Sequence, residues 1–263
     1  IKQIQNSFLQ CHFDTRETES SFKKLIEDKN YNFSRYNFFL INYLLFENKS
    51  IEAKEIIQIA RKEYNTNLLI KQTEIFLNEN KNKIKNFFDC KKSKDPLAEF
   101  FYILANLYSS EKDYKLSNFY LKISLYLNNK FITNKALLAE NFYYQGQNQL
   151  SKNVYNSLKS IGPVYSWYAS KSVAAILLDL KTKKYSIKSL EDEFTSISNP
   201  NFEHYYDLAN FYKDNEYFKE SIKYYTLALK EIKKDHTLVS TIFYRRGIGF
   251  ERIGDWEKAE KDL

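Results

Sequence analysis

The sequence predicts an all-α protein, a right-handed superhelical solenoid built from about seven antiparallel pairs of helices. Three observations predict this fold class. Aromatic and small residues recur with a spacing that repeats at intervals close to ~34 residues, which is typical of helix–turn–helix repeats. Glycine and proline are scarce, with 5 and 3 copies in 263 residues, too few for a sandwich or barrel with many tight turns. Apolar residues outside the repeats also follow helical spacing.

The repeat spacing is clearest in residues 240–263. Counted from Ser240, aromatic residues occupy positions 4 and 11, and the small residues Gly247 and Ala259 occupy positions 8 and 20. Positions 8 and 20 face each other where the two helices of a hairpin come closest, so small side chains there allow the backbones to pack. Large apolar residues at positions 4, 7, 11 and 24 fill the space between one hairpin and the next.

The same spacing continues upstream. It pairs Ala105 with Ser117 and Ala139 with Ser151 at the two small positions, and it is weaker where Ile187 replaces a small residue. Because one hairpin is too small to bury a core alone, stability has to come from the stacking of neighbours. The repeats are expected at residues 98–131, 132–165, 168–201, 202–237 and, truncated, 240–263, with starts 34, 36, 34 and 38 residues apart.

Residues 1–96 are expected to form degenerate helix hairpins that precede the repeats of residues 97–263. In the middle one, Phe38, Ile41 and Leu44 recur at helical spacing. The polar run KKSKDP at residues 91–96 reads as a break, closed by a proline that starts the next helix. The three N-terminal hairpins are expected at residues 1–33, 35–64 and 68–90.

The termini indicate an internal fragment of a longer protein. The chain contains no methionine, Ile1 opens no signal peptide, and Leu263 lies midway through an expected helix. No apolar stretch approaches the ~20 residues of a membrane span; the longest candidate is AAILLDL at residues 174–180. We therefore expect attachment to a membrane only through an N-terminal anchor missing from these residues.

Charge does not point to nucleic acid, although the net charge is +7 and the pI is about 9.0. Lysines are interleaved with glutamate and aspartate, as in EKAEKDL, which is typical of a solvated helix face. The aromatic residues are accounted for by the repeat spacing and form no RNA-binding motif. We expect no nucleic-acid partner.

No constellation of residues predicts catalysis, a metal or a cofactor. His12, His204 and His236 have no neighbours at metal-ligand spacing, and His204 is expected on the surface or in a groove. Cys11 and Cys90 are 79 residues apart, and hairpins this distant in a solenoid rarely touch, so we expect two small buried hydrophobic residues. No glycine-rich phosphate loop occurs. The sequence therefore predicts a protein that is not an enzyme.

The candidate site is the concave groove lined by the first helix of each repeat, where positions 2, 5, 9 and 12 point away from the core. Tyrosine recurs at position 5 and asparagine at position 9. A tyrosine offers a rigid apolar ring with a hydroxyl, and an asparagine donates to and accepts from a backbone, which suits a bound polypeptide. Compositional bias is the alternative explanation of this recurrence. The candidate groove residues are Tyr102, Asn106, Glu140, Tyr143, Tyr206, Asn210, Lys213, Tyr244 and Glu251.

These hairpins resemble tetratricopeptide repeats, a family of protein-interaction scaffolds without catalytic activity of their own. More narrowly, residues 97–128, 205–229 and 243–263 are similar to large proteobacterial envelope proteins of this class. Some of those are outer-membrane lipoproteins that act as adaptors, binding a periplasmic carboxyl-terminal processing protease and its substrates. The resemblance covers roughly residues 34–263. It implies an adaptor whose partners are proteins or peptides, a periplasmic protease among them, in the periplasm or attached to the outer membrane.

One departure from the family reduces the range of expected partners. Some tetratricopeptide proteins bind chaperone C-termini through a clamp of lysine, asparagine and arginine at fixed groove positions. Asn106 and Asn210 match its asparagine, yet Tyr102 and Tyr206 stand where the clamp has a cation. We do not expect a chaperone-tail receptor. The alternatives to the adaptor are a targeting arm of a larger enzyme, such as a glycosyltransferase with fused repeats, and a cytoplasmic assembly factor.

Overall fold

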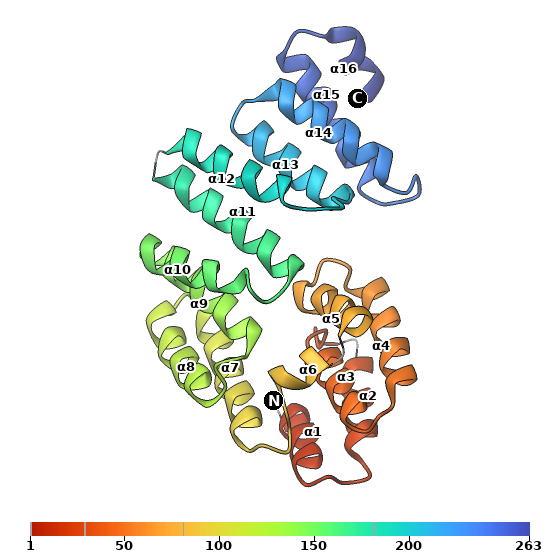
Figure 1. Cartoon of the computed structure of the whole chain (residues 1–263), viewed down its shortest axis with the longest axis vertical. Coiled ribbons are helices and arrows are strands. Elements are labelled where there is room, and N and C mark those ends of the chain that lie inside the picture. Colours follow the sequence, from red (N-terminus) through yellow and green to blue (C-terminus); the bar gives the residue numbers. More distant parts are fainter. Residues whose placement is uncertain (1, 29, 81, 181) are drawn as a thin grey trace. The chain divides into compact units, whose positions relative to one another are not determined.

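The computed structural model describes residues 2–28, 30–80, 82–180 and 182–263, and the regular secondary structure of these residues is entirely α-helical (Figure 1). By chain order the described helices make eight pairs, one more than the approximate expectation, and the all-α prediction is confirmed. The first helices are α1 (Lys2–His12), α3 (Tyr36–Phe46), α5 (Leu68–Glu79), α7 (Lys94–Ser110), α9 (Ile132–Tyr144), α11 (Pro163–Asp179), α13 (Phe202–Asp214) and α15 (Val239–Arg252). The second helices are α2 (Thr18–Glu27), α4 (Ser50–Glu63), α6 (Asn82–Phe87), α8 (Tyr114–Leu127), α10 (Asn148–Leu158), α12 (Lys183–Thr195), α14 (Phe218–Glu231) and α16 (Trp256–Asp262).

The chain divides into two compact units, unit 1 (Ile1–Ile176) and unit 2 (Leu177–Leu263). In unit 1, α1 packs on α2, α3 on α4, α7 on α8 and α9 on α10, while contacts of α2 with α3 and of α8 with α9 join successive pairs. In unit 2, α13 packs on α14, α14 on α15 and α15 on α16. Each unit is therefore a stack of hairpins in which neighbours along the chain are neighbours in space.

Six of the described hairpins turn in the same way. A residue in the left-handed region follows the first helix, and the next N–H donates to the carbonyl five residues earlier at 2.8–3.0 Å. This is the hydrogen bond of a Schellman cap, which satisfies a carbonyl at the end of the first helix. Glycine adopts this conformation without strain at two of the turns. The turn residues are Asp14, Asn48, Lys112, Gly146, Glu216 and Gly254.

In two hairpins the small residues at positions 8 and 20 make the contact that the spacing predicts. The buried hydroxyl of Ser117 on α8 donates to the carbonyl of Ala105 on α7 at 2.7 Å. Ser151 on α10 donates to the carbonyl of Ala139 on α9 at 2.8 Å. In the last hairpin, a Cβ on Gly247 would come within 2.9 Å of the side chain of Leu263. Close approach of the paired helices thus depends on small side chains.

Asn141 connects two successive hairpins through a buried polar network. Its side-chain amide donates to Ser117 Oγ at 2.7 Å and to Asn118 Oδ1 at 2.9 Å, both on α8. Its Oδ1 accepts from Ser109 Oγ on α7 at 2.8 Å. The side chain of Asn141 is fully buried. Because each of these polar groups has a partner, the network fixes the register of α9 against the preceding pair.

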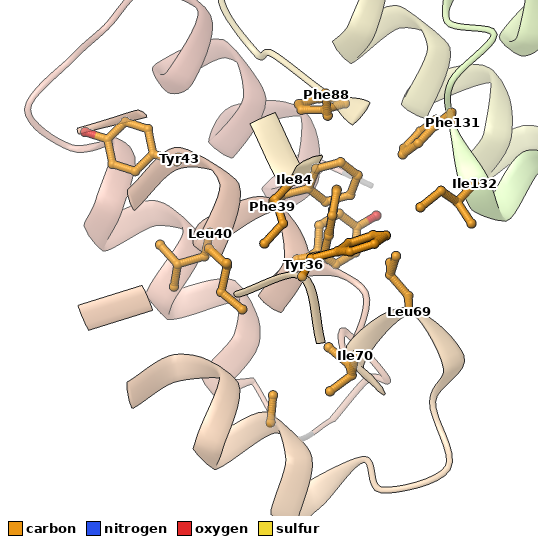
Figure 2. Packing of buried hydrophobic residues seen from close by; sticks show 14 of the residues in the cluster. Tyr36, Phe39, Leu40, Tyr43, Leu69, Ile70, Ile84, Phe88, Phe131 and Ile132 are labelled. Carbon is orange, nitrogen blue, oxygen red and sulfur yellow. The ribbon is translucent and has the colours of Figure 1, made fainter. Parts of the chain in front are cut away.

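The core of unit 1 is richest in aromatic residues around α3, where Figure 2 shows Phe39 with Phe88 and Phe131 near it. The ring of Phe39 lies 4.6 Å from that of Phe88 and 5.8 Å from that of Phe131. All residues from Tyr36 to Leu45 are buried. Phe38, Ile41 and Leu44 are therefore core residues, as expected, but α3 is covered on every side because α2, α4, α5 and α6 surround it.

The expectation that Cys11 and Cys90 are two separate hydrophobic residues is wrong, because they form a disulfide. Their Cα atoms lie 5.8 Å apart, within the range that a disulfide requires. Cys11 lies on α1, and Cys90 follows α6 in the segment that leads to α7. The error has a physical cause. The end of α1 lies beside the segment that precedes α7, so two parts of the chain that are distant in sequence are in contact. In that segment α7 begins at Lys94, and Pro96 lies in its first turn.

Candidate protein-binding surface

All nine candidate groove residues lie on first helices. Unit 1 carries the four on α7 and α9, and unit 2 carries the five on α13 and α15. In unit 1 they are Tyr102, Asn106, Glu140 and Tyr143; in unit 2 they are Tyr206, Asn210, Lys213, Tyr244 and Glu251.

The ring of Tyr102 is covered by an arginine for which the repeat spacing predicts no role. The guanidinium carbon of Arg35 lies 3.9 Å from the centre of that ring. Arg35 also donates to both carboxylate oxygens of the fully buried Glu99, with Nε at 2.8 Å from Oε1. Burial raises the pKa of the Tyr102 hydroxyl. Tyr102 therefore packs within unit 1, whereas Asn106, about one turn further along α7, is exposed.

Side chains from α9, α10 and α11 enclose a pocket of about 200 Å³ in unit 1. Two candidate residues, Glu140 and Tyr143, line it. Tyr168 on α11 donates a hydrogen bond from its hydroxyl to Glu140 Oε1. The rings of Tyr155 and Tyr168 lie 5.7 Å apart at 73° to each other. The other lining residues are Tyr144, Ser172, Ala175 and Ile176.

This pocket contains one acidic side chain. Glu140 is the one acidic or basic residue in its described lining. Burial raises the pKa of Tyr168, with the neighbouring Glu140 carboxylate as a further cause, and burial raises the pKa of Tyr155. Both hydroxyls therefore remain neutral, and that of Tyr168 donates to Glu140. The pocket combines one carboxylate with four tyrosines.

In unit 2, Tyr206 and Asn210 are brought together by two residues from later helices. The guanidinium carbon of Arg245 on α15 lies 5.6 Å from the centre of the Tyr206 ring, and its Nη1 donates to Asn210 Oδ1 at 2.6 Å. The hydroxyl of Tyr225 on α14 donates to the same oxygen at 2.6 Å. Tyr206 at position 5 and Asn210 at position 9 thus lie in one polar cluster, which joins α13, α14 and α15.

The other candidates in unit 2 lie at the surface. Lys213 forms an ion pair with Asp214 at 2.8 Å. Tyr244 exposes 58% of its surface, a large fraction for a tyrosine on a first helix. Glu251, two turns further along α15, is also exposed. Lys213 is held by its neighbour, while Tyr244 and Glu251 are available to a partner.

A second concave surface, for which the repeat spacing gave no signal, lies between α1 and α7. It has a volume of about 560 Å³ and is mainly apolar, with Phe8 and Leu9 on one side and Leu97 and Phe100 on the other. A basic cleft of about 690 Å³ adjoins it and shares the lining residue His12. The walls of the apolar surface come from α1 and α7, which are more than eighty residues apart in the sequence, so no local pattern could have predicted this surface.

The histidines have structural contacts in the described part of the chain. His204 forms a capping box with Asn201 at the start of α13. His12 Nδ1 lies 3.1 Å from the carbonyl oxygen of Cys90, and His236 Nδ1 accepts from the N–H of Leu238. Among the described residues no group of three or more histidine, cysteine, aspartate or glutamate side chains could hold a metal ion. Nor do the helices described include one with the length and apolar character that crossing a bilayer requires.

No protein-family model and no curated protein sequence matches the chain. Solved structures of helical repeat proteins do resemble it. A tetratricopeptide repeat protein from Parabacteroides merdae has 17% identity and a TM-score of 0.43, covering 95% of this chain and 98% of its own. Pseudomonas aeruginosa pilF has 12% identity and a TM-score of 0.46, covering 87% and 88%. YrrB, described as a tetratricopeptide protein with an unusual peptide-binding site, has 15% identity and a TM-score of 0.42, covering 73% and 88%.

Proposed function

We propose that the chain is a non-catalytic scaffold that binds partner polypeptides on the first helices of its hairpins. The observation that carries the proposal is the pocket between α9, α10 and α11. There, Glu140 and Tyr143, whose repeat positions predict a place in the groove, line one cavity with Tyr168 from the next hairpin. A site that spans successive hairpins suits a chain-like ligand, because such a ligand runs across neighbouring repeats.

In each unit, one exposed tyrosine on a first helix offers contact area to a partner. Tyr144 lines the pocket and is 63% exposed, and Tyr244 in unit 2 is 58% exposed. Tyrosine is enriched among the residues that contribute most to binding energy, since a rigid ring buries a large area at small entropic cost. The polar cluster of Tyr206, Asn210 and Arg245 adds hydrogen-bonding groups in unit 2.

The disulfide between Cys11 and Cys90 supports a bacterial envelope location. Structural disulfides persist in oxidising compartments such as the periplasm and are rare in the cytosol. This favours the envelope adaptor over a cytoplasmic assembly factor. With the resemblance of the repeats, it makes a periplasmic protease and its substrates the partner class that we propose to test.

Site-specific photo-cross-linking tests the proposed surface with matched positions in the chain. A photoreactive phenylalanine derivative replaces Tyr144 or Tyr244 on first helices, and Tyr126 or Tyr185 on second helices, where 88% and 75% of the side chain is exposed. We expect adducts with partner polypeptides at the first-helix positions and few at the controls. Equal or greater cross-linking at Tyr126 and Tyr185 would contradict the proposal.

A further inference from the structure

The tyrosines around Glu140 form walls at steep angles to one another. The rings of Tyr155 and Tyr168 are close to perpendicular, at 73°, and those of Tyr143 and Tyr144 are inclined at 51° with centres 5.6 Å apart. The face of an aromatic ring carries negative electrostatic potential, so several rings around one space attract a cation. All of these residues line the same pocket of about 200 Å³.

Several shielded carboxylates of the chain have a cationic partner, whereas Glu140, like Glu191, accepts from a tyrosine hydroxyl. Glu99 is paired with Arg35, Asp262 with Arg246, and Glu19 with two lysines. Glu140 is half-buried, yet among the residues that the structure describes no lysine, arginine or histidine lies within ion-pair distance of it. Its described hydrogen bond comes from the neutral hydroxyl of Tyr168 and involves Oε1.

A half-buried carboxylate without a positively charged partner favours a cationic ligand. Partial exclusion of water from the carboxylate strengthens its attraction to the cation. The pocket has the other requirement for an organic cation, which is aromatic surface that contacts the methylene or methyl groups beside the charge. A small inorganic cation lacks such groups and needs several oxygen ligands, of which the pocket offers one carboxylate and a few hydroxyls.

We propose that this pocket is a cation-binding cage, in which Glu140 pairs with an ammonium or guanidinium group and the tyrosines pack around its carbon atoms. The inference deepens the proposed function and rests on it, since the cation is then a lysine or arginine side chain of the bound polypeptide. A free quaternary ammonium compound has the same chemistry. The volume of about 200 Å³ suits the end of a side chain or one small headgroup and is below that of a site for a drug-sized ligand.

Calorimetric titration of the full chain distinguishes these ligands. The probes are N-acetyl-arginine amide, choline, and 3,3-dimethylbutanol, the neutral analogue of choline. We expect the cations to bind and the neutral analogue to bind at least roughly tenfold more weakly. Binding of the arginine derivative supports a side chain of a partner, and binding of choline alone supports a free quaternary ammonium ligand. Equal binding of choline and its neutral analogue, or binding by none of the three, would overturn the inference.

Glu140→Gln is the decisive variant because it removes the charge and keeps an oxygen that accepts from Tyr168. We expect it to weaken cation binding roughly tenfold. The control is Glu55→Gln on α4, where the glutamate is exposed. Circular dichroism confirms that both variants are folded. An unchanged affinity in Glu140→Gln contradicts the cage.

The cross-linking described above separates this inference from the proposed function. If Tyr144 and Tyr244 positions cross-link to partners while cations do not bind, the scaffold stands and the cage falls. If the first-helix positions fail to cross-link while cations bind through Glu140, the pocket is a small-molecule site and the scaffold proposal falls.

Discussion

Arg35 forms an ion pair with Glu99, although the two residues are 64 positions apart and the Glu99 side chain is fully buried. Arg35 precedes α3 and Glu99 lies in α7, so the pair joins the N-terminal hairpins to the first regular repeat. The same guanidinium covers the rings of Tyr102 and Phe131. A single side chain thus pairs with a buried carboxylate and packs against three aromatic rings, the third being that of Phe39.

Loss of one member of this pair is expected to be costly. Arg35→Met leaves Glu99 as an unpaired buried carboxylate and should lower the free energy of unfolding by about 3–5 kcal/mol in urea titration. The double variant Arg35→Met with Glu99→Leu removes both charges and should recover most of that loss. The partly exposed pair of Arg61 and Glu74 is the control, and Arg61→Met should cost less than about 1 kcal/mol. A loss as small in Arg35→Met as in the control contradicts this description of the pair.

The disulfide is expected to contribute strongly to stability. It closes a loop with a sequence separation of 79, and in the chain-entropy description such a crosslink is worth about 4.5 kcal/mol. Cys11→Ala with Cys90→Ala should therefore lower the free energy of unfolding by about that amount. Thiol titration of denatured, unreduced protein purified from an oxidising compartment should find no free cysteine. Two reactive thiols per chain would show that the disulfide is not formed.

The polar network of Asn141 predicts that two asparagines on successive first helices, Asn141 and Asn106, contribute differently to the free energy of unfolding. Asn141→Ala removes two buried hydrogen bonds and one partly buried one and leaves a cavity, which should cost about 2–4 kcal/mol. Asn106→Ala, at an exposed position of α7, should change stability by less than about 0.5 kcal/mol. Chemical denaturation of both variants measures the difference. Similar values for the two would show that the network does not stabilise the stack.

Glu19 predicts a pH dependence of stability below neutrality. Hydrogen bonds from Lys23 and Lys49 lower its pKa from the ordinary value of 4.5. A carboxyl with a lowered pKa in the folded state stabilises the fold above 4.5, and that contribution is lost as the pH falls through the folded pKa. The urea midpoint of the wild-type chain should therefore fall more steeply below pH 4.5 than that of Glu19→Gln. Parallel pH profiles would rule out this role.

The repeat spacing predicted the parts of the fold that depend on local sequence. Ser117 and Ser151 contact the carbonyls of the small residues that the spacing assigned to them, and Gly146 and Gly254 form the turns of their hairpins. These features follow from short-range geometry, because a hairpin of fixed length brings fixed positions together. The all-α fold is therefore readable from composition and periodicity.

Contacts between distant segments could not be predicted in this way. The disulfide of Cys11 with Cys90 and the ion pair of Arg35 with Glu99 depend on how the irregular N-terminal hairpins pack. Their partners carry no motif, and the even spacing of the repeats favoured the opposite conclusion for the cysteines. The same holds for the candidate site. The spacing predicted that Glu140 lies on a first helix, but only the structure shows that Tyr155 and Tyr168 line the same pocket.

The most direct test of the central claim is the dissociation constant of the complex with a partner identified by cross-linking, measured for two tyrosine variants. Tyr144→Ala removes an exposed ring from the first helix α9, and Tyr126→Ala removes one from the second helix α8. A partner held on first helices should bind Tyr144→Ala about thirtyfold more weakly, equivalent to about 2 kcal/mol, and should bind Tyr126→Ala as it binds the wild type. The reverse pattern, or equal effects of both substitutions, would contradict the claim.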